Sequence, residues 1–241
     1  LKTKPPQGGF QLTKQRNPKT LDRNPLCARQ PVSLINAIKA IIMKNAVIYI
    51  HGQGGNAKEA DYYKKFFDSE HLIIGFDCKS RFPWEAQLGF LIFDLATSQY
   101  NKIYLIANSI GAYYSMLSLA DKSIEEAMFI SPIVDMEKVI LNMMAQSSIS
   151  EANLRKRKEI TTSSGTHLSW RYLSHARNDS IIWNIPTHIL YAENDNITSL
   201  ETMMNFANKI GATVTVMNHG EHWFHTEEQM NFLDKWFKKF I

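Results

Sequence analysis

The sequence lacks the features that mark several classes of protein. Only two of its 241 residues are cysteines, Cys27 and Cys78, and their spacing matches neither a metal site nor a redox motif. Sequence does not decide whether they pair, but two thiols in a reducing, cytoplasmic compartment are the expected state. Internal repeats and low-complexity tracts are absent. Hydrophobic residues make up 44% of the chain, enough for a domain to bury a full core without disulfides or metals.

Long hydrophobic runs and a strong charge of one sign are missing as well. The most apolar stretch, residues 32–50, is interrupted by Lys39 and Lys44, so no stable insertion into a membrane is predicted. The formal net charge is only +4, and most of it comes from six basic residues among the first 23. We expect this basic arm to be solvated, so nucleic acid is not a predicted partner.

The first 42 residues differ in pattern from the rest of the chain. They are rich in Pro, Gln, Asn and Lys at the start, and weakly helical from residue 33 to residue 42. Two interpretations remain open: a native extension that packs as an early strand or helix, or a leader upstream of a start at Met43. We favour the leader, because the regular pattern begins only at Met43.

From Met43 onward, short apolar runs alternate with stretches of helical period. The expected strands are 46–50, 72–76, 103–107, 127–130, 188–192 and 212–217. The expected helices are 57–67, 85–98, 110–119, 200–210 and 227–240. Strands that alternate with helices, and that are apolar almost throughout, predict an α/β fold with a mainly parallel sheet and helices on both faces.

One long interval interrupts the alternation. Three helical pieces, 136–146, 150–158 and 167–177, fit the residues between Ser131 and Pro186, and they predict a small helical cap inserted at about 132–185 of a domain spanning 43–241. Met143 and Trp170 of this cap are candidate contacts to an acyl group, although packing of the cap onto the core explains them equally well. The basic run 155–158 is expected to be a solvated helix face.

Residues 107–111, Ala-Asn-Ser-Ile-Gly, follow an expected strand and open a helix. A serine on such a sharp turn is exposed above the strand ends, and the turn needs small residues two positions before and after the serine. Ala107 and Gly111 meet this need, which makes Ser109 a candidate nucleophile. The competing interpretation is a serine that caps the helix, because a five-residue motif recurs by chance.

A glycine-rich loop, His-Gly-Gln-Gly-Gly at 51–55, follows the strand 46–50. Glycines let a backbone approach a ligand closely and leave its N–H groups unblocked. We expect the backbone N–H groups of Gln53 and Ile110 to form an oxyanion hole, and His51 to brace the loop. A phosphate cradle is the alternative, but the patterns G-x-x-x-x-G-K and G-x-G-x-x-G are both absent.

An acid follows the strand 188–192. Asp195 is expected at the same carboxyl edge of the sheet as Ser109, where open α/β sheets place their sites. An Asx-turn or a helix cap is the alternative role for Asp195. Glu193 and Asp135 compete as candidate acids, since each also follows a strand.

A loop with three histidines follows the strand 212–217. His222 lies in the middle of the loop and is the candidate general base, with Trp223 and Phe224 expected to pin it. His219 and His225 compete: the first leaves the strand, and the second is expected to start the last helix.

The chain order Ser109, Asp195, His222, each after a separate strand, is the order expected for a nucleophile elbow on this fold. These residues and the 51–55 loop resemble the α/β-hydrolase superfamily, specifically small bacterial serine hydrolases related to monoacylglycerol lipases and carboxylesterases, over roughly residues 43–241. The resemblance implies a Ser-His-Asp triad and neither cofactor nor metal. Two features depart from it: Ala107 replaces the usual glycine, and two antiparallel strands that usually precede the oxyanion-loop strand are not evident.

The function predicted from these residues is hydrolysis of a small-molecule carboxylic ester, with a short or medium acyl group, through an acyl-enzyme. A thioesterase or another acyl hydrolase would use the same triad. A catalytically silent binding protein on the same scaffold is the alternative from another class, but it would not need all three groups. The oligomeric state is not predicted.

Overall fold

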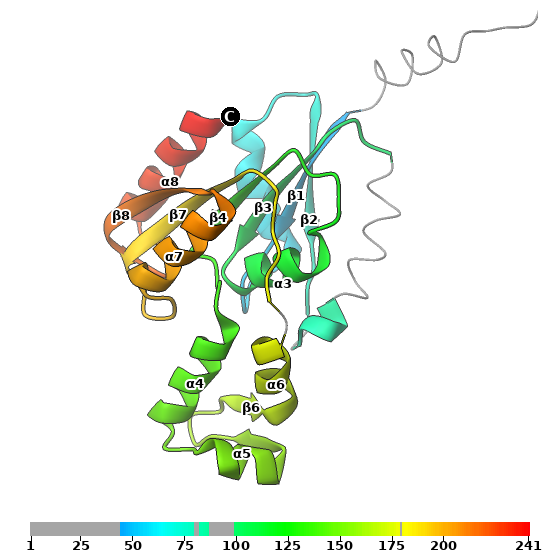
Figure 1. Cartoon of the computed structure of the whole chain (residues 1–241). Helices are drawn as coiled ribbons and strands as arrows, with labels where there is room; N and C mark the ends of the chain where they lie inside the picture. The colour runs from blue at the N-terminus through cyan, green and yellow to red at the C-terminus, as the bar shows by residue number, and fades with distance from the viewer. Residues whose placement is uncertain (1–43, 80–81, 87–98, 179) are drawn as a thin grey trace, which may run out of the picture. The chain divides into compact units, whose positions relative to one another are not determined.

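The structure is a computed structural model that describes residues 44–79, 82–86, 99–178 and 180–241. Within these residues, one sheet is formed by β1 (Asn45–Ile50), β2 (His71–Phe76), β3 (Ile103–Asn108), β4 (Glu126–Ile130), β7 (Thr187–Asn194) and β8 (Thr213–Glu221). The strand order is β2-β1-β3-β4-β7-β8, and each neighbouring pair is parallel (Figure 1). The predicted α/β class and parallel sheet are confirmed. The predicted extension 1–42 lies outside the described residues.

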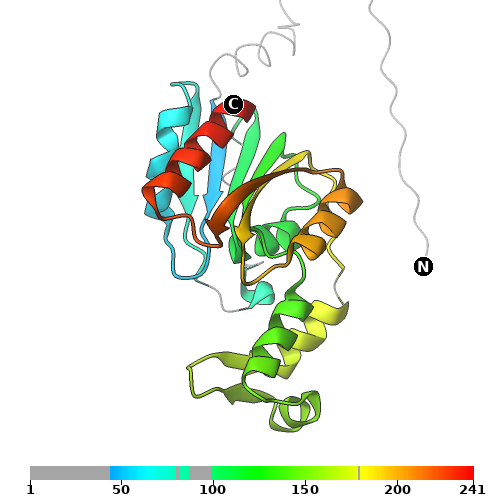
Figure 2. The ribbon, with the colours of Figure 1, turned by 90° about the vertical axis from the view of Figure 1, so that its left-hand side faces the viewer.

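Helices cover both faces of the sheet, as predicted. Successive residues of a strand point to opposite faces, so on β1 Ile48 belongs to one apolar cluster and Tyr49 to the other. The first cluster is covered by α3 (Ile110–Ser118) and α7 (Leu200–Ile210), and the second by η1 (Ala57–Phe66) and α8 (Glu227–Phe240). In Figure 2 the red helix α8 lies across the near face of the sheet.

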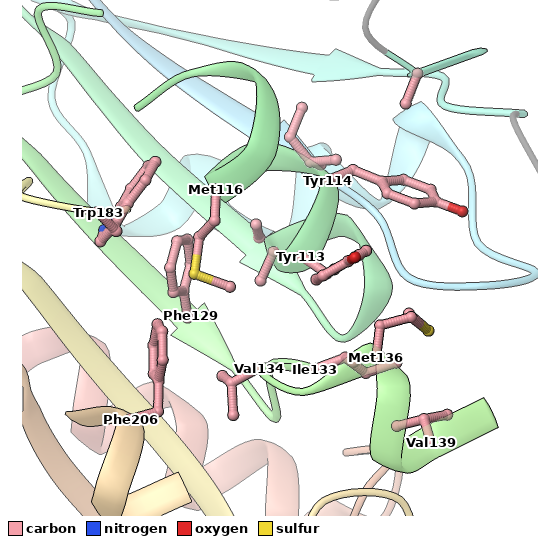
Figure 3. Packing of buried hydrophobic residues seen from close by; sticks show 14 of the residues in the cluster. Tyr113, Tyr114, Met116, Phe129, Ile133, Val134, Met136, Val139, Trp183 and Phe206 are labelled. Carbon is pink, nitrogen blue, oxygen red and sulfur yellow. The ribbon is translucent and has the colours of Figure 1, made fainter. Parts of the chain in front are cut away.

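Large side chains from separate elements fill the first cluster. Figure 3 shows Phe129 of β4 close to Met116 of α3, with Phe206 of α7 and Trp183 on either side. The rings of Phe129 and Trp183 have centroids 5.6 Å apart, and Phe129 is fully buried. Truncating such a side chain to alanine costs about 3–5 kcal/mol. This packing gives the carboxyl ends of β3 and β4 a rigid support.

Local signals explain where the last two helices begin and end. α7 begins after Ser199, whose side chain accepts a hydrogen bond from the N–H of Thr202, and ends at Gly211 with a left-handed φ of 70°. α8 begins after Thr226, which forms a capping box with Gln229. The predicted helices 200–210 and 227–240 are confirmed. The predicted helix 57–67 is a 3₁₀ helix, and most of the predicted helix 85–98 lies outside the described residues.

The segment between β4 and β7 departs from the prediction. It contains α4 (Met136–Gln146), α5 (Glu151–Arg157), β5 (Glu159–Thr161), β6 (His167–Ser169) and α6 (Trp170–Asn178). The antiparallel pair β5–β6 was not predicted, and residues 167–169, predicted as helix, form a strand. Gly165, with a φ of 83°, lies in the turn between the two strands, where a left-handed residue is needed.

Hydrogen bonds between charged side chains connect the helices of residues 136–178, which we call the cap segment. The guanidinium group of Arg177 in α6 donates to Glu137 of α4 and, at 2.8 and 2.9 Å, to both carboxylate oxygens of Glu151 in α5. Lys138 of α4 donates to the hydroxyl of Thr202 in α7 at 3.1 Å, which links the cap to the sheet domain. Among the residues described, no helix is both long enough and apolar enough to cross a membrane.

Candidate active site

Ser109 lies at the sharp turn between β3 and α3. Its φ of 51° and ψ of −119° cost a non-glycine residue about 1–3 kcal/mol. Three backbone hydrogen bonds hold this conformation: Ser109 N–H donates to Ile130 O at 3.0 Å, and Ser109 O accepts the N–H groups of Ala112 and Ile133, each at 3.2 Å. Ser109 occupies the N-cap position of α3, but its hydroxyl makes no capping hydrogen bond to the helix.

The residues on either side of Ser109 leave no space for larger side chains. A Cβ atom at Gly111 would lie 2.4 Å from the carbonyl oxygen of His51 and 2.8 Å from that of Ile50, so only glycine fits there. Ala107 is fully buried in the first apolar cluster. Its methyl group fits at the position where the resemblance implies glycine, and the sharp turn forms nonetheless.

The structure brings the three predicted triad residues together. Oγ of Ser109 lies 2.8 Å from Nε2 of His222, and Nδ1 of His222 lies 2.7 Å from Oδ2 of Asp195. The Asp195 side chain is completely buried, and its second oxygen accepts the N–H groups of Ile197 at 2.8 Å and Thr198 at 3.0 Å. Both carboxylate oxygens are therefore occupied, which fixes the acid in the orientation that faces the imidazole.

The competing acids have other partners. Asp135 caps α4 by accepting the N–H of Lys138. Glu193 accepts the N–H of His219 at 2.7 Å. Asp195 also bonds to backbone N–H groups two and three residues later, so the Asx-type turn and the contact to His222 occur together.

The competing histidines also lie elsewhere. The His219 side chain is 92% exposed, and Nδ1 of His225 donates to the carbonyl oxygen of Trp223 at 2.7 Å. His225 precedes α8 and does not start it. The expectation that Trp223 pins His222 by packing is wrong, since Trp223 is 73% exposed and stacks on His225. The strand β8 runs to residue 221, so His222 directly follows a sheet strand that holds its backbone.

His51 braces the glycine-rich loop, as predicted. Its side chain is buried; Nδ1 lies 2.7 Å from the carbonyl oxygen of Gly52, and Nε2 accepts the N–H of Cys78 at 3.1 Å. The ring therefore fixes the loop from within and stays out of the Ser109–His222 contact.

The loop passes beside Ser109. A Cβ atom at Gly52 would lie 3.3 Å from the Cβ atom of Ser109. The next residue is Gln53, and Ile110 opens α3, where the first N–H groups of a helix have no acceptor within the helix. Within the described part of the chain, neither amide donates a hydrogen bond. This is compatible with an oxyanion hole formed by the two N–H groups, which stays a prediction.

Both candidate acyl contacts, Met143 and Trp170, are partly buried and pack against the first apolar cluster, the cluster that includes α3. Trp170 lies under the guanidinium group of Arg155, 5.7 Å from the ring centroid, and borders a shallow hollow of about 450 Å³ with residues of α5. Packing of the cap segment onto the core accounts for both residues, and their contact with an acyl group stays a prediction.

Three polar side chains behind Ser109 were not predicted: Tyr49, Glu59 and Asn108, which form a chain of hydrogen bonds. One signal could have found Tyr49: a tyrosine in an aliphatic, buried strand needs a partner for its hydroxyl group. Among the residues described, no group of three or more His, Cys, Asp or Glu side chains could hold a metal ion.

Solved structures match this chain, whereas family models and curated proteins do not. No protein-family model and no curated protein matches the sequence. Among solved structures, Est1E from Butyrivibrio proteoclasticus matches with a TM-score of 0.63 and 15% identity, over 82% of this chain and 86% of its own. Alpha/beta hydrolase domain-containing protein 10 from mouse matches with a TM-score of 0.61 and 15% identity, over 81% of this chain and 90% of its own.

The chain has the α/β-hydrolase fold. A third structure of this fold, a proline iminopeptidase-related protein from Thermus thermophilus, matches with a TM-score of 0.54 and 17% identity, over 81% of this chain and 88% of its own. Every strand pair in the described part of the α/β-hydrolase sheet is parallel, so the antiparallel strands implied by the resemblance are not among the described residues.

Proposed function

We propose that the protein is a serine hydrolase that cleaves small-molecule carboxylic esters with a short or medium acyl group. The observation that carries the proposal is the pair of hydrogen bonds that joins Ser109 to His222 and His222 to Asp195. Ser109 lies on a strained turn at the start of α3. Nucleophile, base and orienting acid are the three groups that acyl transfer by a serine needs. The α/β-hydrolase fold supports the proposal, since structures that match include an esterase from Pyrococcus furiosus.

The first half of the reaction acylates the serine. Nε2 of His222 takes the proton from Oγ of Ser109 as Oγ bonds to the ester carbonyl carbon. Asp195 accepts the Nδ1–H of His222 and stabilises the imidazolium that forms. The carbonyl oxygen becomes an oxyanion, which accepts hydrogen bonds from the N–H groups of Gln53 and Ile110. When the carbonyl re-forms, the alkoxide leaves and takes the proton from His222.

The second half releases the acid. His222 takes a proton from a water molecule as the water oxygen bonds to the acyl carbon, and the second oxyanion occupies the same two N–H groups. The intermediate then expels Oγ of Ser109, which takes the proton back from His222. These steps use only residues of this chain and water.

The cap supplies the proposed acyl contacts, Met143 and Trp170. Est1E is known with ferulic acid bound, so an aromatic acid enters at least one protein of this fold. An aromatic ester therefore belongs in the substrate panel for this chain, beside straight-chain esters.

Fluorophosphonate labelling of the wild type beside Ser109→Ala tests the proposal. The reagent phosphonylates an activated serine, so we expect labelling of the wild type and none of the variant. Ser164→Ala, which changes an exposed cap serine, is the matched control and should label like the wild type. A folded wild type that fails to label, or Ser109→Ala with undiminished ester turnover, would overturn the proposal.

A series of p-nitrophenyl esters then measures the acyl preference. The ratio of kcat/KM for a thioester to that for the ester of the same acyl group separates an esterase from a thioesterase, because both reactions use the same triad. We expect the ester to be preferred. A ratio that strongly favours the thioester would replace the ester proposal with thioester hydrolysis.

A further inference from the structure

A chain of hydrogen bonds lies directly behind the nucleophile turn. Tyr49, the next-to-last residue of β1, is 1% exposed. Its hydroxyl group accepts a hydrogen bond from Nδ2 of Asn108 at 2.9 Å and donates to Oε2 of Glu59 at 2.6 Å. Asn108 immediately precedes Ser109, so one end of this chain is attached to the turn that presents the nucleophile.

The other end of the chain is attached to the glycine-rich loop. Oε1 of Glu59 accepts the N–H of Asn56, the residue that ends the loop and caps η1, at 3.0 Å. The same carboxylate lies against Gly55, where a Cβ atom would be 2.6 Å from Oε1. Glu59 therefore contacts the loop at Gly55, which lies two residues after Gln53.

The hydroxyl at the centre of this link is buried, whereas Glu59 and Asn108 are half-buried. Burial raises the pKa of Tyr49 far above its ordinary value, and the neighbouring Tyr63 and Glu59 raise this pKa further. The Tyr49 hydroxyl therefore keeps its proton and remains a hydrogen-bond donor. A buried hydroxyl that loses its partners is costly, which favours the arrangement in which the Tyr49 hydroxyl keeps both of its hydrogen bonds.

We propose that Tyr49 and Glu59 are positioning residues that hold the N–H group of Gln53 at the correct distance from Ser109. The inference rests on the proposed hydrolase function, because Gln53 donates to the oxyanion only in that reaction. Oxyanion donors must lie about 2.7–3.1 Å from the developing charge, and misplacement by about 1 Å lowers the rate by up to about a hundredfold. Neither side chain touches the substrate.

The variant Tyr49→Phe tests the link by removing one oxygen atom. We expect kcat for a p-nitrophenyl ester to fall about ten- to a hundredfold, with KM nearly unchanged, because the loop would no longer fit the transition state. The rate of fluorophosphonate labelling should fall in parallel. The pH profile of kcat/KM should keep its shape, since His222 and Asp195 are untouched.

Tyr62→Phe is the matched control. Tyr62 lies one residue from Tyr63 in η1, packs against the same apolar cluster as Tyr49, and donates to the carboxylate of Asp234 in α8. The substitution also removes one hydrogen bond between a tyrosine and a carboxylate, but this bond joins η1 to α8 and does not involve the loop. We expect wild-type kcat from Tyr62→Phe. Equal kcat in the two variants, or a change confined to KM, would overturn the inference.

A second pair of variants keeps the test decisive if Tyr49→Phe folds poorly. Glu59→Gln retains a side-chain oxygen and the length of the side chain, whereas Glu59→Ala removes the link. We expect kcat to fall more in Glu59→Ala than in Glu59→Gln at matched thermal stability. Equal losses would contradict the inference. Wild-type protein that neither labels nor hydrolyses esters would instead contradict the proposed function itself.

Discussion

Nδ1 of His222 lies 2.7 Å from Oδ2 of Asp195, and the Asp195 carboxylate is completely buried. The second carboxylate oxygen receives two backbone N–H groups from the turn that follows, so the acid cannot rotate without losing hydrogen bonds. The imidazole is thereby held with Nε2 directed to Ser109. Three separate strand ends supply these groups, which makes the arrangement depend on the register of the whole sheet.

The variant Asp195→Asn should lose most of the activity and retain the fold. An amide at this position can present N–H to His222 and favour the wrong tautomer, with Nε2 protonated and unable to take the serine proton. We expect kcat to fall about 10³–10⁴-fold with a small change in KM. Steady-state kinetics on a p-nitrophenyl ester measures both values.

Glu193→Gln is the control for Asp195→Asn, since Glu193 is the next-to-last residue of β7, two residues before Asp195, and bonds to His219 instead of His222. It should keep kcat within about twofold of the wild type. If Glu193→Gln lost activity and Asp195→Asn retained it, the acid would be misassigned.

Substitution at Gln53 separates its backbone from its side chain. Gln53→Pro removes the N–H group proposed as an oxyanion donor, and we expect kcat to fall about 10²–10³-fold. Gln53→Ala keeps the N–H group and removes only an exposed side chain, so kcat should stay near the wild-type value. Circular dichroism of both variants checks the fold. Similar losses in the two variants would point to a role for the side chain.

The strand-end residues were predictable because their positions follow from periodicity and chain order. Ser109, Asp195 and His222 each come directly after a strand that contains an apolar run, and parallel strands end at one edge. Helix limits such as Ser199 and Gly211 follow from local capping chemistry. These signals lie within a few residues of the feature that they predict.

Features that depend on distant partners were not predictable. Tyr49 acquires its role from Glu59 and Asn108, which are 10 and 59 residues away, and no local pattern links the three. The strands β5 and β6 have only three residues each, too few for an alternating pattern to be recognised. The exposure of Trp223 depends on its stacking against His225, which residue type alone does not indicate.

The acyl contacts proposed in the cap give a prediction about chain length. If Met143 contacts the acyl group, Met143→Ala should raise KM for medium-chain p-nitrophenyl esters several-fold, at about 0.8 kcal/mol for each methylene group that is no longer buried, and leave the acetate ester nearly unchanged. Trp170→Ala, in a hollow that α5 lines, provides the comparison. Uniform changes across the chain-length series would indicate that these residues only pack the cap.

Arg177→Gln should loosen the cap in a way that depends on pH. The hydrogen bond from Arg177 holds the pKa of Glu151 below its ordinary value of 4.5, so this contact stabilises the fold fully above pH 4.5. The stabilisation is lost as the pH falls below 4.5 through the lowered pKa of the folded state. We therefore expect the Tm of the variant to lie below that of the wild type at pH 7, and the difference to shrink as the pH is lowered toward 3.

Arg157→Gln is the control for this measurement, because the described residues give Arg157 no ion pair. Its Tm should follow that of the wild type at every pH. Thermal unfolding monitored by circular dichroism at matched ionic strength gives all three curves. A difference between Arg177→Gln and the wild type that stayed constant down to pH 3 would mean that Arg177 acts by packing, since protonation of Glu151 would then have no effect on the contact.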